Sequence, residues 1–286
     1  MQIPGLFNLT NKDTIPDCIF ILDGNQGVGK SVYCRNFYLD GLLNGDFCIY
    51  MDCLLDPIEF KNFFSDIKED IWDQNSLFIN PYKIKGQIDK KLDIVIEQLT
   101  YTIESIQNKF VNDKSKHIRI VIDSLTHLLV LFDEKAAEDF IKRIYFLLKP
   151  HNTMGIFTLV FHSINEYIVN RLTCLFDGII EMRLEDRSNN DVNDSSTLSS
   201  ITRKIRILSI KNMAHTPNWI SFEISNEGNI VFNEKKNIHC YLCKEPITND
   251  LVLYSELPFH SVHLEIYKKF SRLYGIDVAD VGISSS

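Results

Sequence analysis

The sequence contains few of the residues that interrupt regular structure. Only 12 of its 286 residues are glycine and 8 are proline, whereas 45% are hydrophobic. Long disordered tracts usually carry less apolar surface and more charge of one sign. No apolar run approaches the roughly 20 residues that a membrane-spanning helix requires. We therefore expect a globular protein without a membrane segment, large enough for one α/β domain and a small accessory unit.

The sequence also lacks an excess of basic residues and a secretory signal. The formal net charge is −8, so the chain lacks the basic field that drives non-specific binding to nucleic acid. Residues 1–10 do not show the basic start and apolar stretch of a signal peptide. The seven cysteines are odd in number, and Cys18, Cys34 and Cys48 lie in apolar segments. We therefore expect a cytoplasmic protein without a disulfide framework.

A glycine-rich segment follows the first apolar strand, which we expect at residues 18–22. It reads Gly-Asn-Gln-Gly-Val-Gly-Lys-Ser and matches the phosphate-binding pattern Gly-x4-Gly-Lys-Ser/Thr. In such a loop the backbone N–H groups surround a polyphosphate, and the next helix directs its positive end toward it. A turn that only caps a helix would not need the whole pattern. The predicted nucleotide-binding residues are Gly24, Asn25, Gln26, Gly27, Val28, Gly29, Lys30 and Ser31.

Apolar periodicity predicts alternating strands and helices along most of the chain. Strands are expected at 47–51, 77–79, 118–123, 156–161 and 177–182, and helices at 32–43, 56–64, 88–106 and 134–148. Strands at 205–210, 219–224 and 230–232 predict an antiparallel finish, and the polar residues 187–200 predict a loop. The fold class is therefore α/β, with a large, mostly parallel sheet flanked by helices.

An acidic residue ends one of these strands. Asp123 follows the apolar run 118–122, and Mg²⁺ prefers oxygen ligands at the carboxyl edge of a parallel sheet. We predict that Ser31 and Asp123 hold Mg²⁺ together. The alternative is that Asp123 only caps the next helix.

The chain resembles the KaiC-like ATPases of the RecA superfamily, which occur widely in archaea and in the cyanobacterial clock. The glycine loop at 24–31, its helix and the strand at 48–51 follow the order of that family. Residues 121–126, 176–180 and 203–215 are similar to its aspartate strand and later elements. The resemblance covers about residues 1–232. It implies a RecA-like P-loop ATPase domain at 1–234, with ATP and Mg²⁺ as cofactors, and a homo-oligomeric ring, for example a hexamer, with ATP between subunits.

Two departures from the family pattern concern catalysis. The family carries paired glutamates after the second strand, one of which polarises the attacking water, but this chain has Asp52 and Cys53. Asp52 can still accept a proton from a shorter side chain, so the resemblance predicts slow hydrolysis. The family's Lys-x-Arg pair, which reaches the γ-phosphate of the neighbouring subunit, corresponds to Ser209 and Lys211. Lys211 is then the only cation supplied between subunits, unless it is merely a solvated charge on a strand.

A polar pair follows the strand expected at 156–161. His162 and Ser163 stand where the superfamily often places a residue that senses the γ-phosphate. A histidine that caps the next helix is the alternative interpretation.

Residues 235–286 carry a second pattern and are predicted to form a small domain. Cys240-x2-Cys243 is followed, after sixteen residues, by His260-x2-His263, which we expect at the start of a helix. Four such ligands can surround Zn²⁺ tetrahedrally, and the spacing is similar to half of a LIM-type finger. The alternatives are exposed histidines and cysteines buried in apolar contacts. We predict a zinc-finger-like extension in which the metal contributes to folding.

These patterns together predict an ATPase with Lys30, Asp52, Asp123 and Lys211 as catalytic residues. Slow hydrolysis would serve as a regulatory or signalling switch read by an unknown partner. One alternative is a DNA recombination or repair ATPase, but residues 187–200 hold one arginine against two aspartates and are not a basic channel loop. The other is a nucleotide sensor that does not hydrolyse ATP, which Cys53 and Ser209 favour.

Overall fold

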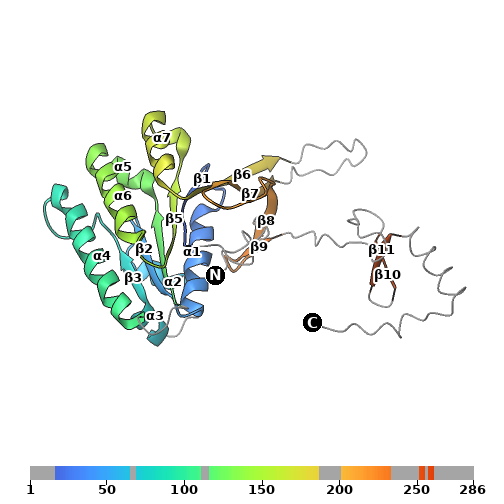
Figure 1. Cartoon of the computed structure of the whole chain (residues 1–286), viewed down its shortest axis with the longest axis horizontal. Coiled ribbons are helices and arrows are strands. Elements are labelled where there is room, and N and C mark those ends of the chain that lie inside the picture. Colours follow the sequence, from blue (N-terminus) through green and yellow to red (C-terminus); the bar gives the residue numbers. More distant parts are fainter. Residues whose placement is uncertain are drawn as a thin grey trace, which may run out of the picture. The chain divides into compact units, whose positions relative to one another are not determined.

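The computed structural model of the chain describes residues 17–64, 69–110, 116–186, 201–232, 251–254 and 257–260. The chain contacts divide it into two units, Met1–Phe232 and Asn233–Ser286. The described residues of the first unit form an α/β domain with helices on both faces of a twisted sheet (Figure 1). In the second unit, the strands β10 (Leu251–Tyr254) and β11 (Leu257–His260) form an antiparallel pair.

Helices and strands alternate along most of the first unit. Its elements are β1 (Ile19–Gly24), α1 (Lys30–Leu43), β2 (Phe47–Asp52), α2 (Pro57–Asn62), α3 (Glu69–Asn75), β3 (Ser76–Ile79), α4 (Ile88–Phe110), β4 (Ile118–Asp123), α5 (Leu125–Leu131), α6 (Glu134–Leu148), β5 (Thr153–Leu159), η2 (Phe161–Ser163), α7 (Glu166–Leu175), β6 (Gly178–Asp186), β7 (Ile201–Ile210), β8 (Ile220–Ile224) and β9 (Ile230–Phe232).

The nine strands that the structure describes in this unit lie in one sheet, in the order β3-β2-β4-β5-β1-β6-β7-β8-β9. The strands from β3 to β6 pair in parallel, and β6 to β9 pair antiparallel. This confirms the expected mostly parallel sheet with an antiparallel finish. Strand β5 lies between β1 and β4 and is parallel to both. The carboxyl ends of β1 and β4 therefore lie on the same edge of the sheet, one strand apart.

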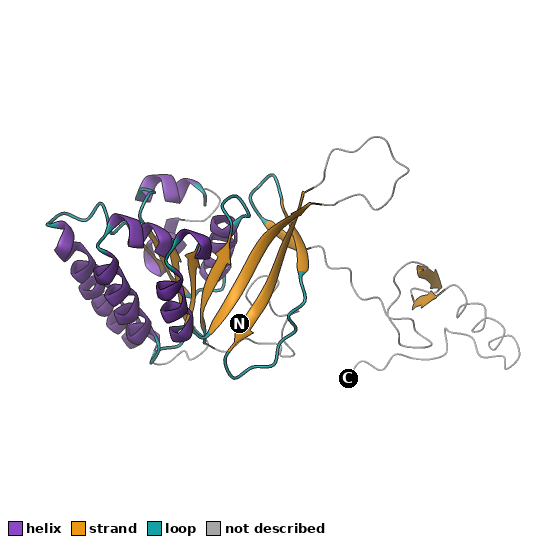
Figure 2. Cartoon of the chain, turned by 90° about the horizontal axis from the view of Figure 1, so that it is seen from above, coloured by secondary structure: helices purple, strands orange, loops and turns teal. Residues whose placement is uncertain are grey.

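Each face of the sheet buries its own apolar core. On one face, alternate residues of β1, β2 and β4 pack with buried side chains of α4, α5, α6 and α7. On the other, the intervening residues pack with α1, with β8, and with the side chains of Phe60, Phe64, Ile71 and Trp72. The two layers of helices are visible from above in Figure 2. Because both faces are covered, the parallel strands read as nearly continuous apolar runs, as expected for a buried parallel sheet.

The β8–β9 hairpin is attached to helix α1 by one side chain. Asn36 Nδ2 donates to the carbonyl oxygen of Gly228 at 2.9 Å, and the backbone N–H of Ile230 donates to Asn36 Oδ1 at 3.1 Å. The same amide donates to the Val32 carbonyl within the helix, at 2.9 Å. Beside it, a Cβ on Gly29 would lie 2.9 Å from Cδ1 of Ile224. The last strands of the unit therefore lie directly against the start of α1.

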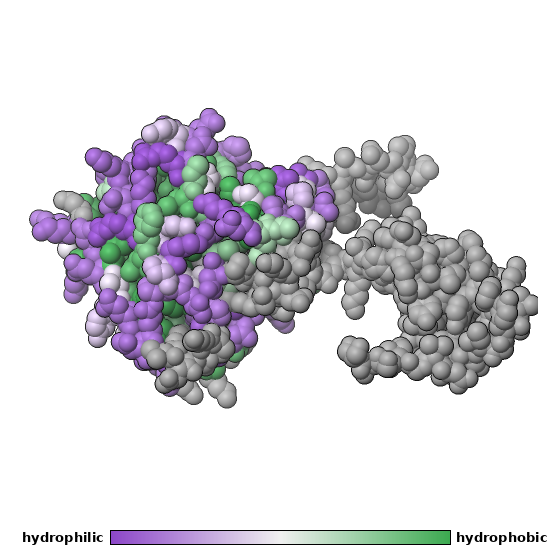
Figure 3. Space-filling view, viewed as in Figure 1, coloured by the Kyte–Doolittle hydropathy of each residue, from purple (hydrophilic) through white to green (hydrophobic). Residues whose placement is uncertain are grey.

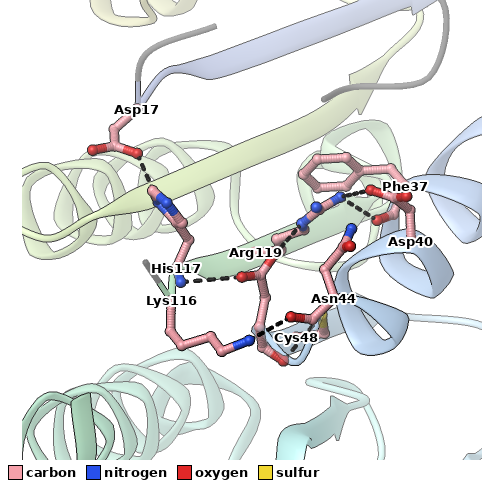
Figure 4. Close-up of polar contacts among 9 residues, drawn as sticks. Asp17, Phe37, Asp40, Asn44, Cys48, Lys116, His117 and Arg119 are labelled. Atoms are coloured by element: carbon pink, nitrogen blue, oxygen red, sulfur yellow. Dashed lines mark hydrogen bonds and ion pairs between the residues drawn. The ribbon is translucent and has the colours of Figure 1, made fainter. Parts of the chain in front are cut away.

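A buried arginine on β4 contacts both α1 and the turn between α1 and β2, at the opposite edge of the sheet (Figure 4). Arg119 is 1% exposed, and its Nε lies 2.8 Å from Asp46 Oδ2. Its Nη1 donates to the Phe37 carbonyl at 3.0 Å and lies 2.8 Å from Asp40 Oδ2. A Cβ on Gly41 would lie 2.5 Å from Arg119 Cδ, so only glycine lets the guanidinium pass this close to the helix. These contacts fix the end of α1 on the strand that ends at Asp123.

Several sequence-based expectations are corrected by the structure. The strand expected at 156–161 runs from Thr153 to Leu159, and the helix expected at 56–64 is the shorter Pro57–Asn62, which Asp56 caps. The helices α3, α5 and α7 were not expected. His260 ends strand β11 instead of standing at the start of a helix.

One face of the described residues is mainly polar. Hydrophilic residues cover most of the coloured face in Figure 3, with small apolar patches between them. Within the described ranges, no helix combines the length and apolar character needed to cross a membrane.

Candidate functional site

The glycine loop connects β1 to α1 at the carboxyl edge of the sheet. The backbone at Gly29 has φ +107°, a left-handed conformation that favours glycine. A Cβ on Gly24 would lie 2.6 Å from the Met182 carbonyl oxygen of the neighbouring strand β6. Both glycines are therefore required by the loop's path. Helix α1 starts at Lys30 without a side-chain cap among the described residues and without an acidic residue in its first turn, which leaves its N–H groups for an anion.

Lys30 lies over this loop. Its ammonium donates to the carbonyl oxygen of Gly24 and, at 3.1 Å, to that of Asn25. Burial lowers the pKa of Lys30, and the negative charges of Asp23 and Asp123 partly offset this shift. Asp123 ends β4, and only β5 lies between β4 and β1 in the sheet, so the structure places at one edge the two groups that sequence reasoning assigned to one site.

Asp123 is buried at the end of β4 and is held by two hydroxyl groups. Thr158 Oγ1 donates to its Oδ1 at 2.7 Å, and the Tyr50 hydroxyl donates to its Oδ2 at 3.1 Å. The next helix, α5, is capped by Ser124, whose Oγ accepts from the backbone N–H of His127 at 3.2 Å. The capping role considered for Asp123 thus belongs to its neighbour.

Asp52 ends β2 and lies opposite Asp123 in the register of the two strands. Its Oδ1 accepts hydrogen bonds from the backbone N–H groups of Leu54, at 2.6 Å, and Leu55, at 3.0 Å. Burial raises the pKa of Asp52, and those two hydrogen bonds oppose the rise. One carboxylate oxygen is therefore engaged in holding the turn after β2, while the adjacent Cys53 is a buried free thiol.

The end of β5 is fixed from both sides. The backbone N–H of Val160 donates to Thr126 Oγ1 at 3.1 Å, and that of Phe161 donates to Asp23 Oδ1 at 3.0 Å. Burial raises the pKa of Asp23. His162 follows in the short helix η2, and helix α7 is capped by Asn165 rather than by this histidine.

Lys211 follows β7 and contacts its own chain. Its ammonium donates to the carbonyl oxygens of Cys174, at 2.9 Å, and Leu175, at 3.2 Å, at the end of α7. A cation at a helix C-terminus is stabilising. The residue is exposed, so its predicted role toward a neighbouring subunit remains a prediction.

The predicted zinc ligands lie mostly outside the described residues. Cys240, Cys243 and His263 are not described, and of His260 only the backbone position in β11 is described. Within the described ranges, no group of three or more histidine, cysteine or acidic side chains could hold a metal ion.

The donor groups at the carboxyl edge suit Mg²⁺. A hard cation prefers oxygen ligands, often one or two carboxylates together with phosphate oxygens. Ser31 supplies a hydroxyl, and each oxygen of Asp123 accepts one hydroxyl hydrogen bond and retains a second acceptor position. These two residues therefore fit the ion that the motif implies.

Sequence reasoning missed three residues that this edge uses. Asp23 carries a signal, since it is an acidic residue between an apolar strand and the glycine loop. Tyr50 and Thr158 carry none, because they lie within apolar runs and their shared partner is far away in the sequence.

The comparisons with known proteins agree with this geometry. The KaiC ATPase family matches residues 1–236 of the chain. A KaiC-like protein from the hyperthermophilic archaeon Pyrococcus horikoshii OT3 has a similar fold, with a TM-score of 0.59 and 16% sequence identity over 80% of this chain and 95% of that one. No curated protein sequence matches the chain. Since the family match covers most of the sequence and the sheet carries the family's glycine loop, this chain belongs to the KaiC ATPase family, with a RecA-like fold.

Proposed function

We propose that this protein binds ATP with Mg²⁺ between the glycine loop and Asp123, and hydrolyses it slowly as a regulatory switch. The observation that carries the proposal is the placement of the glycine loop, after β1, and of Asp123, at the end of β4, on the same edge of the sheet with only β5 between their strands. In open α/β sheets, ligands bind at the carboxyl ends of strands where the chain connections diverge. Here α1 and α7 leave β1 and β5 toward opposite faces.

Each residue has a distinct role in this proposal. The N–H groups of the loop and of the first turn of α1 bind the phosphates, and Lys30 exchanges its contacts with the loop carbonyls for the β- and γ-phosphates. Ser31 and Asp123 hold Mg²⁺, which when bound neutralises charge that develops on the phosphates. Asp52 orients the attacking water and accepts its proton.

A second candidate, a nucleotide sensor that does not hydrolyse ATP, is favoured by a specific observation. Asp52 Oδ1 is occupied by two backbone N–H groups, and the ammonium of Lys211 caps α7 of its own chain. Both groups that would drive turnover are thus engaged in structural contacts. Catalysis then depends on the second oxygen of Asp52 and on release of Lys211.

ATP binding and phosphate release, measured on the same preparation, test the two candidates. Lys30→Ala is expected to weaken ATP binding about 10- to 100-fold, because a hydrogen bond to a charged group contributes about 1.5–3 kcal/mol. Lys90→Ala is the matched control, since that lysine is exposed on α4, and it should bind ATP as the wild type does.

Turnover separates hydrolysis from sensing. If the wild type releases phosphate and Asp52→Asn does not, the switch is an ATPase. ATP binding without phosphate release above background would reject the ATPase and leave the sensor. Failure of the wild type to bind ATP in the presence of Mg²⁺ would reject both.

The ring and the zinc site are further parts of the proposal. ATP between subunits, as the family resemblance implies, requires assembly, so light scattering should show a larger species when ATP and Mg²⁺ are present. Cys240, Cys243, His260 and His263 are proposed to bind one Zn²⁺, which metal analysis of the wild type and of Cys240→Ser would detect. A wild type without zinc, or equal zinc in both proteins, contradicts that site.

A further inference from the structure

The carboxylate of Asp123 is held from both neighbouring strands. Tyr50 lies on β2 and Thr158 on β5, the two strands that pair with β4. Their hydroxyl groups donate to different oxygens of the same carboxylate, at 3.1 Å and 2.7 Å. Both donors are buried, with Tyr50 1% and Thr158 0% exposed. The two contacts therefore restrain the rotation of the carboxyl group in both directions.

The surroundings of the two donors do not require a hydroxyl. The ring of Tyr50 lies 4.4 Å from that of Phe60, centroid to centroid, in a cluster of aromatic side chains, where phenylalanine would pack equally well. Thr158 is the second-last residue of β5 and is flanked by apolar residues. A buried hydroxyl costs free energy unless it is hydrogen-bonded. Two such groups on one carboxylate indicate that the orientation of Asp123 matters.

Orientation matters most when a carboxylate holds Mg²⁺. This ion demands nearly ideal octahedral geometry at short ligand distances, and groups that orient a metal ligand commonly change metal affinity 10- to 100-fold when removed. Hydroxyl donors are neutral, so they fix the carboxylate without cancelling its negative charge.

We propose that Tyr50 and Thr158 are positioning residues that orient Asp123 for Mg²⁺, acting through that carboxylate and touching neither the ion nor the nucleotide. The inference rests on the proposed ATP and Mg²⁺ site. It assigns a role to two side chains that the phosphate-loop pattern does not include.

Single-atom substitutions test it. Tyr50→Phe and Thr158→Val each remove one hydroxyl and keep the shape of the side chain, and Thr158→Ser keeps the hydroxyl. Matched controls exist in the same elements or clusters. Tyr38→Phe removes a hydroxyl from the aromatic cluster that contains Tyr50, and Thr153→Val removes a hydroxyl from β5, the strand of Thr158. Neither of these two hydroxyls contacts a carboxylate among the described residues.

The readout is binding of a fluorescent ATP analogue by the full chain as Mg²⁺ is titrated, beside binding in EDTA. Tyr50→Phe and Thr158→Val are expected to raise the half-saturating Mg²⁺ concentration about 10-fold and to leave binding in EDTA unchanged. Thr158→Ser, Tyr38→Phe and Thr153→Val are expected to titrate as the wild type does. Melting temperatures, measured in parallel, report the purely structural contribution.

The result that overturns the inference is a Mg²⁺ titration of Tyr50→Phe and Thr158→Val that equals those of the control variants, even if both melt at lower temperature. Wild-type binding that does not depend on Mg²⁺ would also overturn it, while ATP binding itself would stand. Absence of ATP binding by the wild type would reject the proposed function, and with it this role.

Discussion

Replacing Arg119 by methionine would test whether its buried ion pair with Asp46, in the turn between α1 and β2, stabilises the first unit. The guanidinium is 1% exposed and the Asp46 side chain 4% exposed, so both charges are removed from water. Removing one partner leaves the carboxylate buried without its counter-charge, which costs about 3–5 kcal/mol. Asp40 is 39% exposed, and its pairing with Arg119 adds little because water screens it.

The expected change is large enough for a simple measurement. A loss of about 3–5 kcal/mol corresponds to a fall in Tm of roughly 6–20 °C for a unit of this size. Urea unfolding followed by tryptophan fluorescence is suitable, because both tryptophans, Trp72 and Trp219, lie in the first unit. Asp46→Asn and the double variant complete a double-mutant cycle. The loss of stability in the double variant should differ from the sum of the two single losses by roughly 0.5–3 kcal/mol.

An exposed pair provides the control. Arg143 lies 2.5 Å from Asp93, with 43% and 55% of the side chains exposed, so Arg143→Met should cost at most about 1 kcal/mol. If Arg119→Met costs no more than this control, or if the double variant equals the sum of its parts, the stabilising role argued for the buried pair is refuted.

Three further predictions follow from the loop, the acidic edge and the cysteines. Gly29→Ala should lower the free energy of unfolding by about 1–2 kcal/mol, because the backbone there is left-handed, and should also weaken ATP binding. Gly86 is left-handed too (φ +130°), so the control Gly86→Ala should lower stability but leave ATP binding unchanged. Equal ATP binding by the two variants would contradict this prediction. Burial raises the pKa of Asp52 above 3.8, so the folded state binds that proton more tightly and loses stability as pH rises from 3.8 through the folded-state pKa. Urea unfolding over this range should show wild type losing stability relative to Asp52→Asn, and a constant difference would refute it. Burial raises the pKa of Cys18 to about 11, whereas Cys174 is exposed. Iodoacetamide at neutral pH should therefore label Cys174 before Cys18 in peptide mass spectra, and equal labelling rates of these two would contradict the prediction.

Much of the fold was predictable because its strands are buried on both faces. The predicted strand 118–123 and helix 134–148 coincide with β4 and α6. The segment 125–131 is short and ends in four consecutive apolar residues, so it shows no clear helical period, which is why α5 was missed. Strand β5 ends before Val160, although the apolar run continues, because the next two N–H groups donate to Thr126 and Asp23 instead of a strand.

The candidate site was predictable only where its residues are neighbours in the sequence. The glycine loop is one continuous segment, and Asp123 stands at a strand end. Tyr50 lies 73 residues from Asp123, and in sequence it is one more aromatic residue in an apolar strand. Contacts of this kind arise from strand order, which local periodicity does not encode.

The attachment of the β8–β9 hairpin to α1 through Asn36 has a practical consequence for shortened versions of this protein. A chain that stopped after β7 would keep the whole glycine motif but would remove Ile224 from beside Gly29 and leave the amide of Asn36 without Gly228 and Ile230. A fragment made to test nucleotide binding should therefore extend at least through Phe232, although the motif itself ends at Ser31, 201 residues earlier.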